Sequence, residues 1–160
     1  MKIMLTCLTI LLFVFSWVAS AAENEIRIEA LNSVPNAVGL EEGLVGGGPP
    51  GKEGLAQLKE QGIMIVIDVR DPKEGVAEEW ALASALGMNY YNIPVTLDNF
   101  SVAQAGQIAD ILEKPGSKPA LLHCASGNRA VGIWALYQNK HRGVPADKAL
   151  AEAEDRKSVV

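Results

Sequence analysis

Residues 119–129 read Pro-Ala-Leu-Leu-His-Cys-Ala-Ser-Gly-Asn-Arg. The apolar start of this stretch predicts a short strand, and Arg129 opens a new helical pattern of apolar residues. The stretch therefore predicts a strand, a tight glycine-containing loop and a helix N-terminus. Backbone N–H groups in such a loop, together with the positive end of the helix dipole, form a binding site for anions. The same field favours thiolate over thiol, so Cys124 is predicted to be a nucleophile.

The apolar pattern of the whole chain alternates between strands and helices. Residues 63–67 form a continuous apolar run that predicts a strand buried on both faces of a sheet. Further strands are predicted over 90–95 and 120–123, with two short edge strands within 26–45. Helices are predicted over 52–61, 75–87, 102–112, 129–140 and 145–155, and the third is expected to begin with a capping box of Ser101 and Gln104. This alternation predicts one α/β domain, a three-layer sandwich with a central, mainly parallel sheet flanked by helices.

Polar residues follow three of the predicted strands. These are Asp68, Arg70 and Asp71 after the first buried strand, the loop of residues 96–99 after the next, and His123 with Cys124 after the last. Because ligands bind beyond the carboxyl ends of parallel strands, we expect these residues to converge on one cleft. Arg70 and Lys73 are expected to form surface ion pairs at its rim.

The first 22 residues have the composition of a secretory signal peptide. Lys2 supplies a positive charge, residues 3–18 are apolar, and residues 19–22 read Ala-Ser-Ala-Ala, a small-residue cleavage site. A retained membrane anchor is the alternative, since an apolar run of about 16 residues approaches the lower limit of a span. Cleavage would leave residues 23–160 as a single domain, periplasmic or secreted, with no membrane contact.

Charge and cysteine content narrow the function classes. The chain has 14 Lys and Arg against 19 Asp and Glu, a formal net charge of −5, and no basic cluster, which argues against nucleic acid as a partner. Without the leader, Cys124 is the only cysteine, so an intramolecular disulfide is excluded. With only two histidines in the chain, no metal site or other cofactor is predicted. No pattern in the sequence specifies an oligomeric state.

The loop of residues 123–129, His-Cys-x-Ser-Gly-x-Arg, resembles that of the cysteine-dependent phosphatases of the protein tyrosine and dual-specificity type, which reads H-C-x-x-G-x-x-R-[S/T]. Over residues 40–140 the chain looks more closely like a small bacterial phosphatase-like family also found fused to β-lactamase-type hydrolases. The segment 87–95, Gly-Met-Asn-Tyr-Tyr-Asn-Ile-Pro-Val, contributes to this resemblance. The resemblance implies a cysteine-phosphatase-like fold, and an enzyme that hydrolyses a phosphomonoester and binds a small anionic substrate or a phosphorylated ligand.

The same resemblance implies a role for each residue of the loop. Cys124 would attack phosphorus, Arg129 would clamp two phosphoryl oxygens with its planar fork, and His123 would orient the loop and help to hold the thiolate. Asp98 stands where the family carries its general acid, and Asp71 is the alternative for that role. The anion-binding loop itself would consist of Ala125, Ser126, Gly127 and Asn128.

Two features depart from the phosphatase pattern. Four residues separate Cys124 from Arg129 instead of five, which gives a smaller ring of N–H donors, and Ala130 replaces the hydroxyl residue that assists departure of the thiolate. The four-residue spacing, like the sequence Ile-Asp-Val-Arg-Asp over residues 67–71, resembles rhodanese sulfurtransferases, in which Cys124 would carry a persulfide. A third hypothesis is an anion-binding or redox-sensing domain without turnover.

Overall fold

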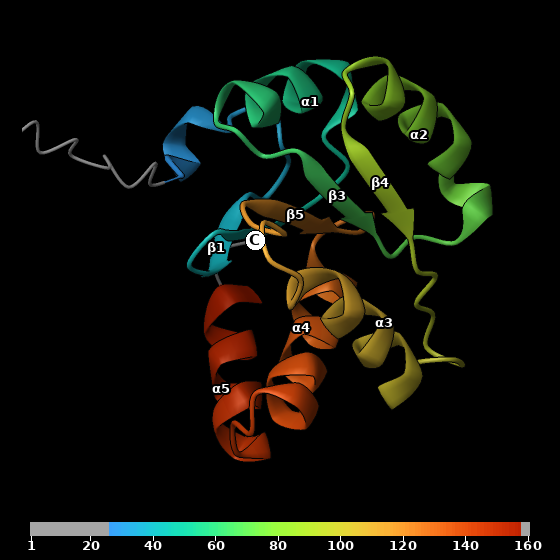
Figure 1. Ribbon diagram of the computed structural model, residues 1–160. Helices are drawn as coiled ribbons and strands as arrows, with labels where there is room; N and C mark the ends of the chain where they lie inside the picture. The colour runs from blue at the N-terminus through green and yellow to red at the C-terminus, as the bar shows by residue number, and fades with distance from the viewer. Residues whose placement is uncertain (1–25, 158–160) are drawn as a thin grey trace, which may run out of the picture.

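A five-stranded sheet forms the middle layer of the fold (Figure 1). Its order is β1-β2-β5-β3-β4, and the strands span Val38–Glu41 (β1), Leu44–Gly47 (β2), Ile65–Asp68 (β3), Asn89–Asn92 (β4) and Ala120–His123 (β5). Strands β2, β5, β3 and β4 run parallel, whereas β1 pairs antiparallel with β2. The carboxyl ends of the four parallel strands therefore meet along one edge of the sheet.

The computed structural model describes residues 26–157. The predicted signal peptide, residues 1–22, lies outside the described residues. Between residues 26 and 157, no helix is both long enough and apolar enough to cross a lipid bilayer.

Helices cover both faces of the sheet. Figure 1 shows α1 (Gly51–Glu60) and α2 (Val76–Ala85) on one face, and α3 (Val102–Leu112), α4 (Asn128–His141) and α5 (Ala146–Lys157) on the other. Successive strand residues point to opposite faces, so each strand contributes to two cores. In β5, Leu121 packs with Val66 in the core under α1, and Leu122 packs with Ile67 in the core under α4. The predicted three-layer α/β sandwich with a mainly parallel sheet is confirmed.

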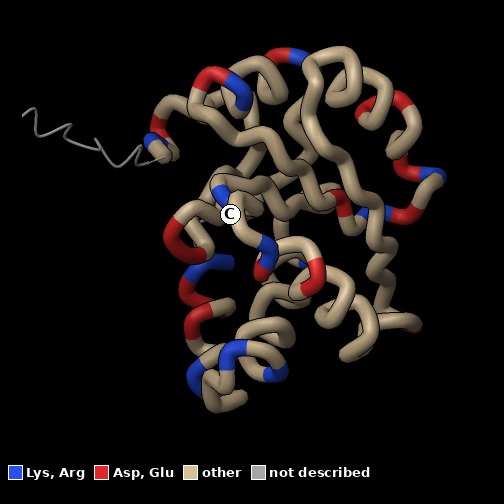
Figure 2. The backbone as a smooth tube through the Cα atoms, viewed as in Figure 1, with Lys and Arg blue, Asp and Glu red and all other residues tan. Residues whose placement is uncertain are grey.

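Charged residues are concentrated in the outer layers. Figure 2 shows both signs on helices and connecting loops, with few charged positions on the strands. Among the strand residues, only Glu41 and Asp68 are acidic and none is Lys or Arg. Because Asp68 is fully buried at the carboxyl end of β3, it needs partners there that neutralise its charge.

Three local predictions are wrong. Within residues 26–45, Ile28–Ala30 forms a short 3-10 turn instead of a strand, because the apolar side chains that follow, Leu31 and Val34, enter the core without any strand pairing. Strand β2 is not an edge strand, since it lies between β1 and β5. The Ser101 hydroxyl makes no cap hydrogen bond to the backbone of α3 and contacts the Gln104 side chain instead, so the predicted capping box is absent.

Candidate active site

The loop that joins β5 to α4 folds back over the sulfur of Cys124. The backbone N–H of Gly127 donates to Sγ of Cys124 at 3.1 Å. Gly127 has φ of 95°, in the left-handed region where a side chain would be strained, so glycine permits this tight return. Cys124 is almost fully buried and unpaired with any other cysteine of the described chain. The sulfur therefore accepts a hydrogen bond from a backbone N–H, as a thiolate in an anion-binding loop would.

The N-terminus of α4 faces the same loop. The helix begins at Asn128, and Gly127 caps it without any side-chain hydrogen bond. The first N–H groups of a helix have no partner within the helix, and they carry the positive end of its dipole. On the outer side of the loop, Nδ2 of Asn36 donates to the carbonyl of Ser126 at 3.2 Å. Residues 124–128 therefore form a loop that is held from outside by Asn36 and directs the N–H of Gly127 at the sulfur of Cys124.

Arg129 enters this loop with its guanidinium fixed by two neighbours. Its Nη1 and Nη2 donate to the two carboxylate oxygens of Glu74 at 2.9 and 2.7 Å. Nη1 also donates to the carbonyl of Val95 at 3.1 Å. The hydrogen bonds with Glu74, together with interactions with Cys124, raise the pKa of Arg129.

The same ion pair lowers the pKa of Glu74, chiefly through the hydrogen bonds from Arg129. A carboxyl group with a depressed folded pKa stabilises the fold at pH values above its unfolded pKa. That contribution disappears only as the pH falls through the lower folded pKa. The Glu74–Arg129 pair is thus fully ionised at neutral pH and persists into the acid range.

His123 lies beneath the loop in a buried network of charged and polar groups. Asp68 accepts hydrogen bonds from Nη2 of Arg70 at 2.7 Å and from the hydroxyl of Tyr90 at 2.5 Å. Glu79 lies 3.1 Å from Nη2 of Arg70 and 2.8 Å from Nε2 of His123. The short contact with His123 is not aligned as a hydrogen bond. This network joins β3, α2, β4 and β5 directly under the nucleophile.

Burial and ion pairing oppose each other in this network. Burial alone raises the pKa of Asp68, but hydrogen bonds from Arg70, the charge of His123 and the Tyr90 hydroxyl together hold it below the ordinary value. Burial and the hydrogen bond to Asp68 raise the pKa of Tyr90, which therefore stays a donor. Asp68 consequently remains an anion inside the protein, stabilised by its partners.

The network also contains the one group of potential metal ligands within residues 26–157. Ligand atoms of Asp68, Glu79 and His123 lie within 4.8 Å of one another. However, both oxygens of Asp68 are already hydrogen-bonded to the guanidinium of Arg70. Arg70 thus supplies the cation that two buried carboxylates require, and we assign no metal to this cluster.

The expected cleft forms only in part. The N–H of Gly127 contacts the sulfur of Cys124. The carbonyl of Val95, three positions before Asp98, accepts a hydrogen bond from Arg129. Asp98 itself is exposed on the turn that follows Val95. By contrast, Asp68 and Arg70 turn inward, so the predicted surface pair of Arg70 is wrong: it is a buried ion pair with Asp68. The reason is the burial of the Asp68 carboxylate, which requires a counter-ion inside the protein, and Arg70 is close enough to supply it.

Asp71, the alternative general acid, has a structural task in this fold. Its side chain accepts from the backbone N–H of Lys73 at 3.0 Å, and Glu74 accepts in return from the backbone N–H of Asp71 at 2.7 Å. These reciprocal bonds form a capping box around the 3-10 turn η2 (Pro72–Glu74).

Three residues of the site were missed by sequence reasoning: Glu74, Glu79 and Tyr90. The spacing of Asp71, Pro72 and Glu74 is a capping-box pattern, which was a local signal for the conformation of this turn. This pattern does not indicate that Glu74 pairs with Arg129, which is 55 positions away in the sequence. Glu79 carries no distinguishing pattern, since Glu78 beside it on α2 is exposed. Tyr90 belongs to the segment 87–95 that contributes to the family resemblance, but this segment does not indicate a contact with Asp68.

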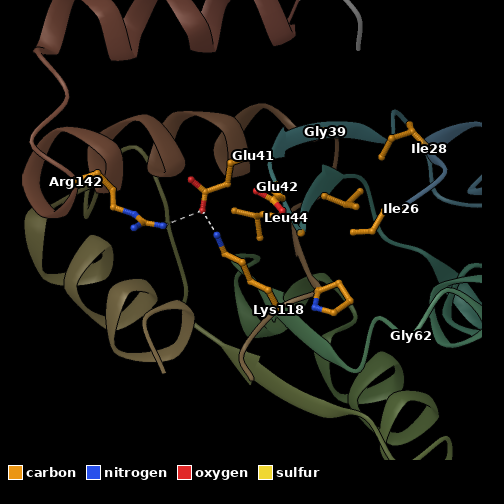
Figure 3. Close-up of a pocket in the computed structure, with 12 residues that line it drawn as sticks. Ile26, Ile28, Gly39, Glu41, Glu42, Leu44, Gly62, Lys118 and Arg142 are labelled. Atoms are coloured by element: carbon orange, nitrogen blue, oxygen red, sulfur yellow. Dashed lines mark hydrogen bonds and ion pairs between the residues drawn. The ribbon is translucent and has the colours of Figure 1, made fainter. Parts of the chain in front are cut away.

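A hollow of about 1050 Å³ lies at the opposite end of the sheet from Cys124 (Figure 3). It is lined by residues at the starts of β2 and β5, including Leu44 and Pro119, whereas Cys124 follows the end of β5. Figure 3 shows the carboxylate of Glu41 between Lys118 and Arg142, and Glu41 forms ion pairs with both. Both of its cations are paired with Glu41, and its lining includes no thiol, hydroxyl or imidazole group, so this hollow is not a candidate for nucleophilic chemistry.

A family model described as "DSP-PTPase phosphatase fused to NAD+ Kinase" matches residues 27–158, which is most of the chain. No curated protein sequence matches the chain.

Several solved structures share the fold. A DUF442 protein from Shewanella putrefaciens CN-32, provisionally named a phosphatase, has a TM-score of 0.66 and 24% identity, covering 82% of this chain and 97% of that chain. The core catalytic domain of the PP-IP phosphatase SIW14 from S. cerevisiae has a TM-score of 0.64 and 17% identity, covering 77% of each chain. TpbA from P. aeruginosa has a TM-score of 0.60 and 20% identity, covering 76% of this chain and 73% of that chain. At these identities the likeness establishes the fold.

Proposed function

Since the chain belongs to the family described as DSP-PTPase phosphatase fused to NAD+ kinase, we propose that its Cys124 loop hydrolyses phosphomonoesters. The observation that carries this proposal is the hydrogen bond from the Gly127 N–H to the sulfur of Cys124 at 3.1 Å, in a loop followed by the Arg129 guanidinium that Glu74 holds. Related folds have been solved with anions: a Cys-to-Ser variant of TpbA with pTyr, and SIW14 with citrate. We further propose that residues 1–22 direct export and are removed, leaving a periplasmic or secreted enzyme.

In the proposed reaction, the Cys124 thiolate attacks phosphorus, a P–S bond forms and the P–O bond to the leaving group breaks. Asp98 gives its proton to the leaving oxygen. Arg129 and the N–H groups of the loop hold the equatorial oxygens as charge accumulates. Water then attacks the cysteinyl-phosphate, Asp98 accepts a proton from that water, and inorganic phosphate leaves as the thiolate is restored. Ala130 supplies no hydroxyl to help the sulfur depart, so this second step is the slow one.

The reduced protein is expected to release phosphate from p-nitrophenyl phosphate or phosphotyrosine, with inhibition by vanadate. Because the second step is slow, rapid mixing should show a burst of about one p-nitrophenol per enzyme before the steady rate. The matched assay is sulfur transfer from thiosulfate to cyanide, which tests the rhodanese-like alternative suggested by the four-residue spacing. Sulfur transfer without any phosphate release from several aryl phosphates would reject the phosphatase.

Asp98 and Asp71 are distinguished by one pair of variants. Asp98→Asn is expected to lower kcat for phenyl phosphate by about 100-fold, because this poor leaving group needs a proton. Asp71→Asn should have a much smaller effect, since Asn also serves as a cap at the start of a helical turn. The measurement is kcat for phenyl phosphate compared with p-nitrophenyl phosphate, whose better leaving group should reduce the effect of Asp98→Asn. The opposite ranking of the two variants would assign the general acid to Asp71.

A further inference from the structure

The hydrogen bonds of Arg129 leave one edge of its guanidinium free. Arginine has five N–H donors, one on Nε and two on each terminal nitrogen. Glu74 takes one from Nη1 and one from Nη2, and the carbonyl of Val95 takes the second from Nη1. The remaining donors, on Nε and Nη2, lie on the same side of the planar group. Two parallel donors of this kind match two oxygens of a tetrahedral anion.

Glu74 is itself held in place before it meets Arg129. Its carboxylate accepts from the backbone N–H of Asp71 at 2.7 Å, and its backbone carbonyl accepts from Nη1 of Arg70 at 3.1 Å. Arg70 is anchored in turn by its buried ion pair with Asp68. A continuous set of contacts therefore runs from the buried network, through the 3-10 turn, to the guanidinium at the rim of the Cys124 loop.

We propose that Glu74 is a positioning residue that orients Arg129, so that the free edge of the guanidinium faces the anion held over Cys124. This inference rests on the proposed function of the Cys124 loop as an oxyanion site. Without Glu74, the long arginine side chain would sample many rotamers, and binding an anion would first have to restrict them. The interaction of Arg129 with Cys124 is consistent with this orientation.

Whether anion binding becomes weaker or tighter when Glu74 is neutralised tests the proposal. Glu74 is a negative charge next to an anion site, so a purely electrostatic neighbour predicts that its neutralisation tightens anion binding. A positioning residue predicts the reverse. We expect Glu74→Gln to raise the Kd for tungstate, an inert tetrahedral dianion, by about tenfold, a loss of about 1.4 kcal/mol. Isothermal titration calorimetry on the full, reduced chain gives this Kd without any need for turnover.

Two further variants make the result interpretable. Glu78→Gln makes the same charge change at an exposed position of α2 and should leave the Kd unchanged. Glu74→Ala removes the carboxylate without introducing an amide group that would face the guanidinium, and it should weaken binding as Glu74→Gln does. Both Glu74 variants should unfold at a somewhat lower temperature than the wild type, because they lose the ion pair with Arg129 and weaken the contact with Asp71, but both should be folded at the temperature of the titration.

Each outcome decides the proposal. Weaker tungstate binding in both Glu74 variants supports it, even if the wild-type protein hydrolyses no phosphomonoester and only the proposed function fails. Equal or tighter binding overturns the role of Glu74 and leaves the phosphatase proposal intact. If the wild-type protein binds no tungstate, the oxyanion site itself is absent and both proposals are rejected.

Discussion

Cys124→Ser is expected to lower the steady-state rate of phosphate release by at least about 10⁴-fold. A serine hydroxyl is not ionised at neutral pH, and the N–H of Gly127, which contacts Sγ, is a donor that cannot remove its proton. Oxygen is smaller than sulfur and occupies the same place, so the loop should keep its conformation. The variant should therefore lose the chemistry and keep the binding site.

Two measurements separate these effects. Phosphate release is compared with the Kd for tungstate, which should change by less than about threefold, well below 1 kcal/mol. Cys7→Ser is the matched control, because Cys7 is the other cysteine of the chain and lies in the predicted leader. Hydrolysis by Cys124→Ser within tenfold of wild type would show that Cys124 is not the nucleophile.

Arg129→Lys is expected to lower kcat/KM for phosphomonoesters by about 1000-fold. Lysine keeps the positive charge but has a single ammonium group instead of a planar fork. It therefore loses the two-point contact with Glu74 as well as the two parallel donors proposed for the anion. Both the orientation of the cation and its fit to two oxygens disappear, which is why the loss should be large at constant charge.

Arg142→Lys is the matched control for this prediction. Arg142 pairs with Glu41 at the opposite end of the sheet and has no contact with the Cys124 loop. The same substitution there should leave kcat/KM unchanged within about twofold, which is below 1 kcal/mol. If Arg129→Lys retained wild-type kcat/KM, the reaction would depend on charge alone, and the guanidinium geometry would be irrelevant to it.

The sequence was sufficient to predict the framework that carries the loop. The run of apolar residues over 63–67 and the strand over 120–123 identify the buried centre of the sheet, because a strand covered on both faces has no polar positions. The order of a strand, a glycine loop and a helix also places Cys124 at the carboxyl edge of a parallel sheet. These are local properties, since each depends on neighbours a few positions away.

The partners of the site residues could not be predicted in this way. Arg129 meets Glu74 from 55 positions away, and Ser126 is held by Asn36 from 90 positions away. Arg70 looked like a surface residue, yet it is buried against Asp68, because burial depends on how α2 closes over the end of β3. The missing capping box of Ser101 is by contrast a local difference, since its hydroxyl contacts the side chain of Gln104, three positions away, and not the backbone of α3.

The sequence by itself determined the fold class, the nucleophile candidate and its loop, because the spacing of apolar residues and the positions of glycines are properties of short segments. Only the tertiary structure decided which charges meet. A buried carboxylate needs a partner wherever the packed helices and strands can supply one, and the distance along the chain has no bearing on that choice. Arg70 thereby became an internal counter-ion of Asp68. The packing of the turn after β3 against α4 also made the exposed Glu74 a neighbour of Arg129, so the anion loop has a cation that is held by an ion pair.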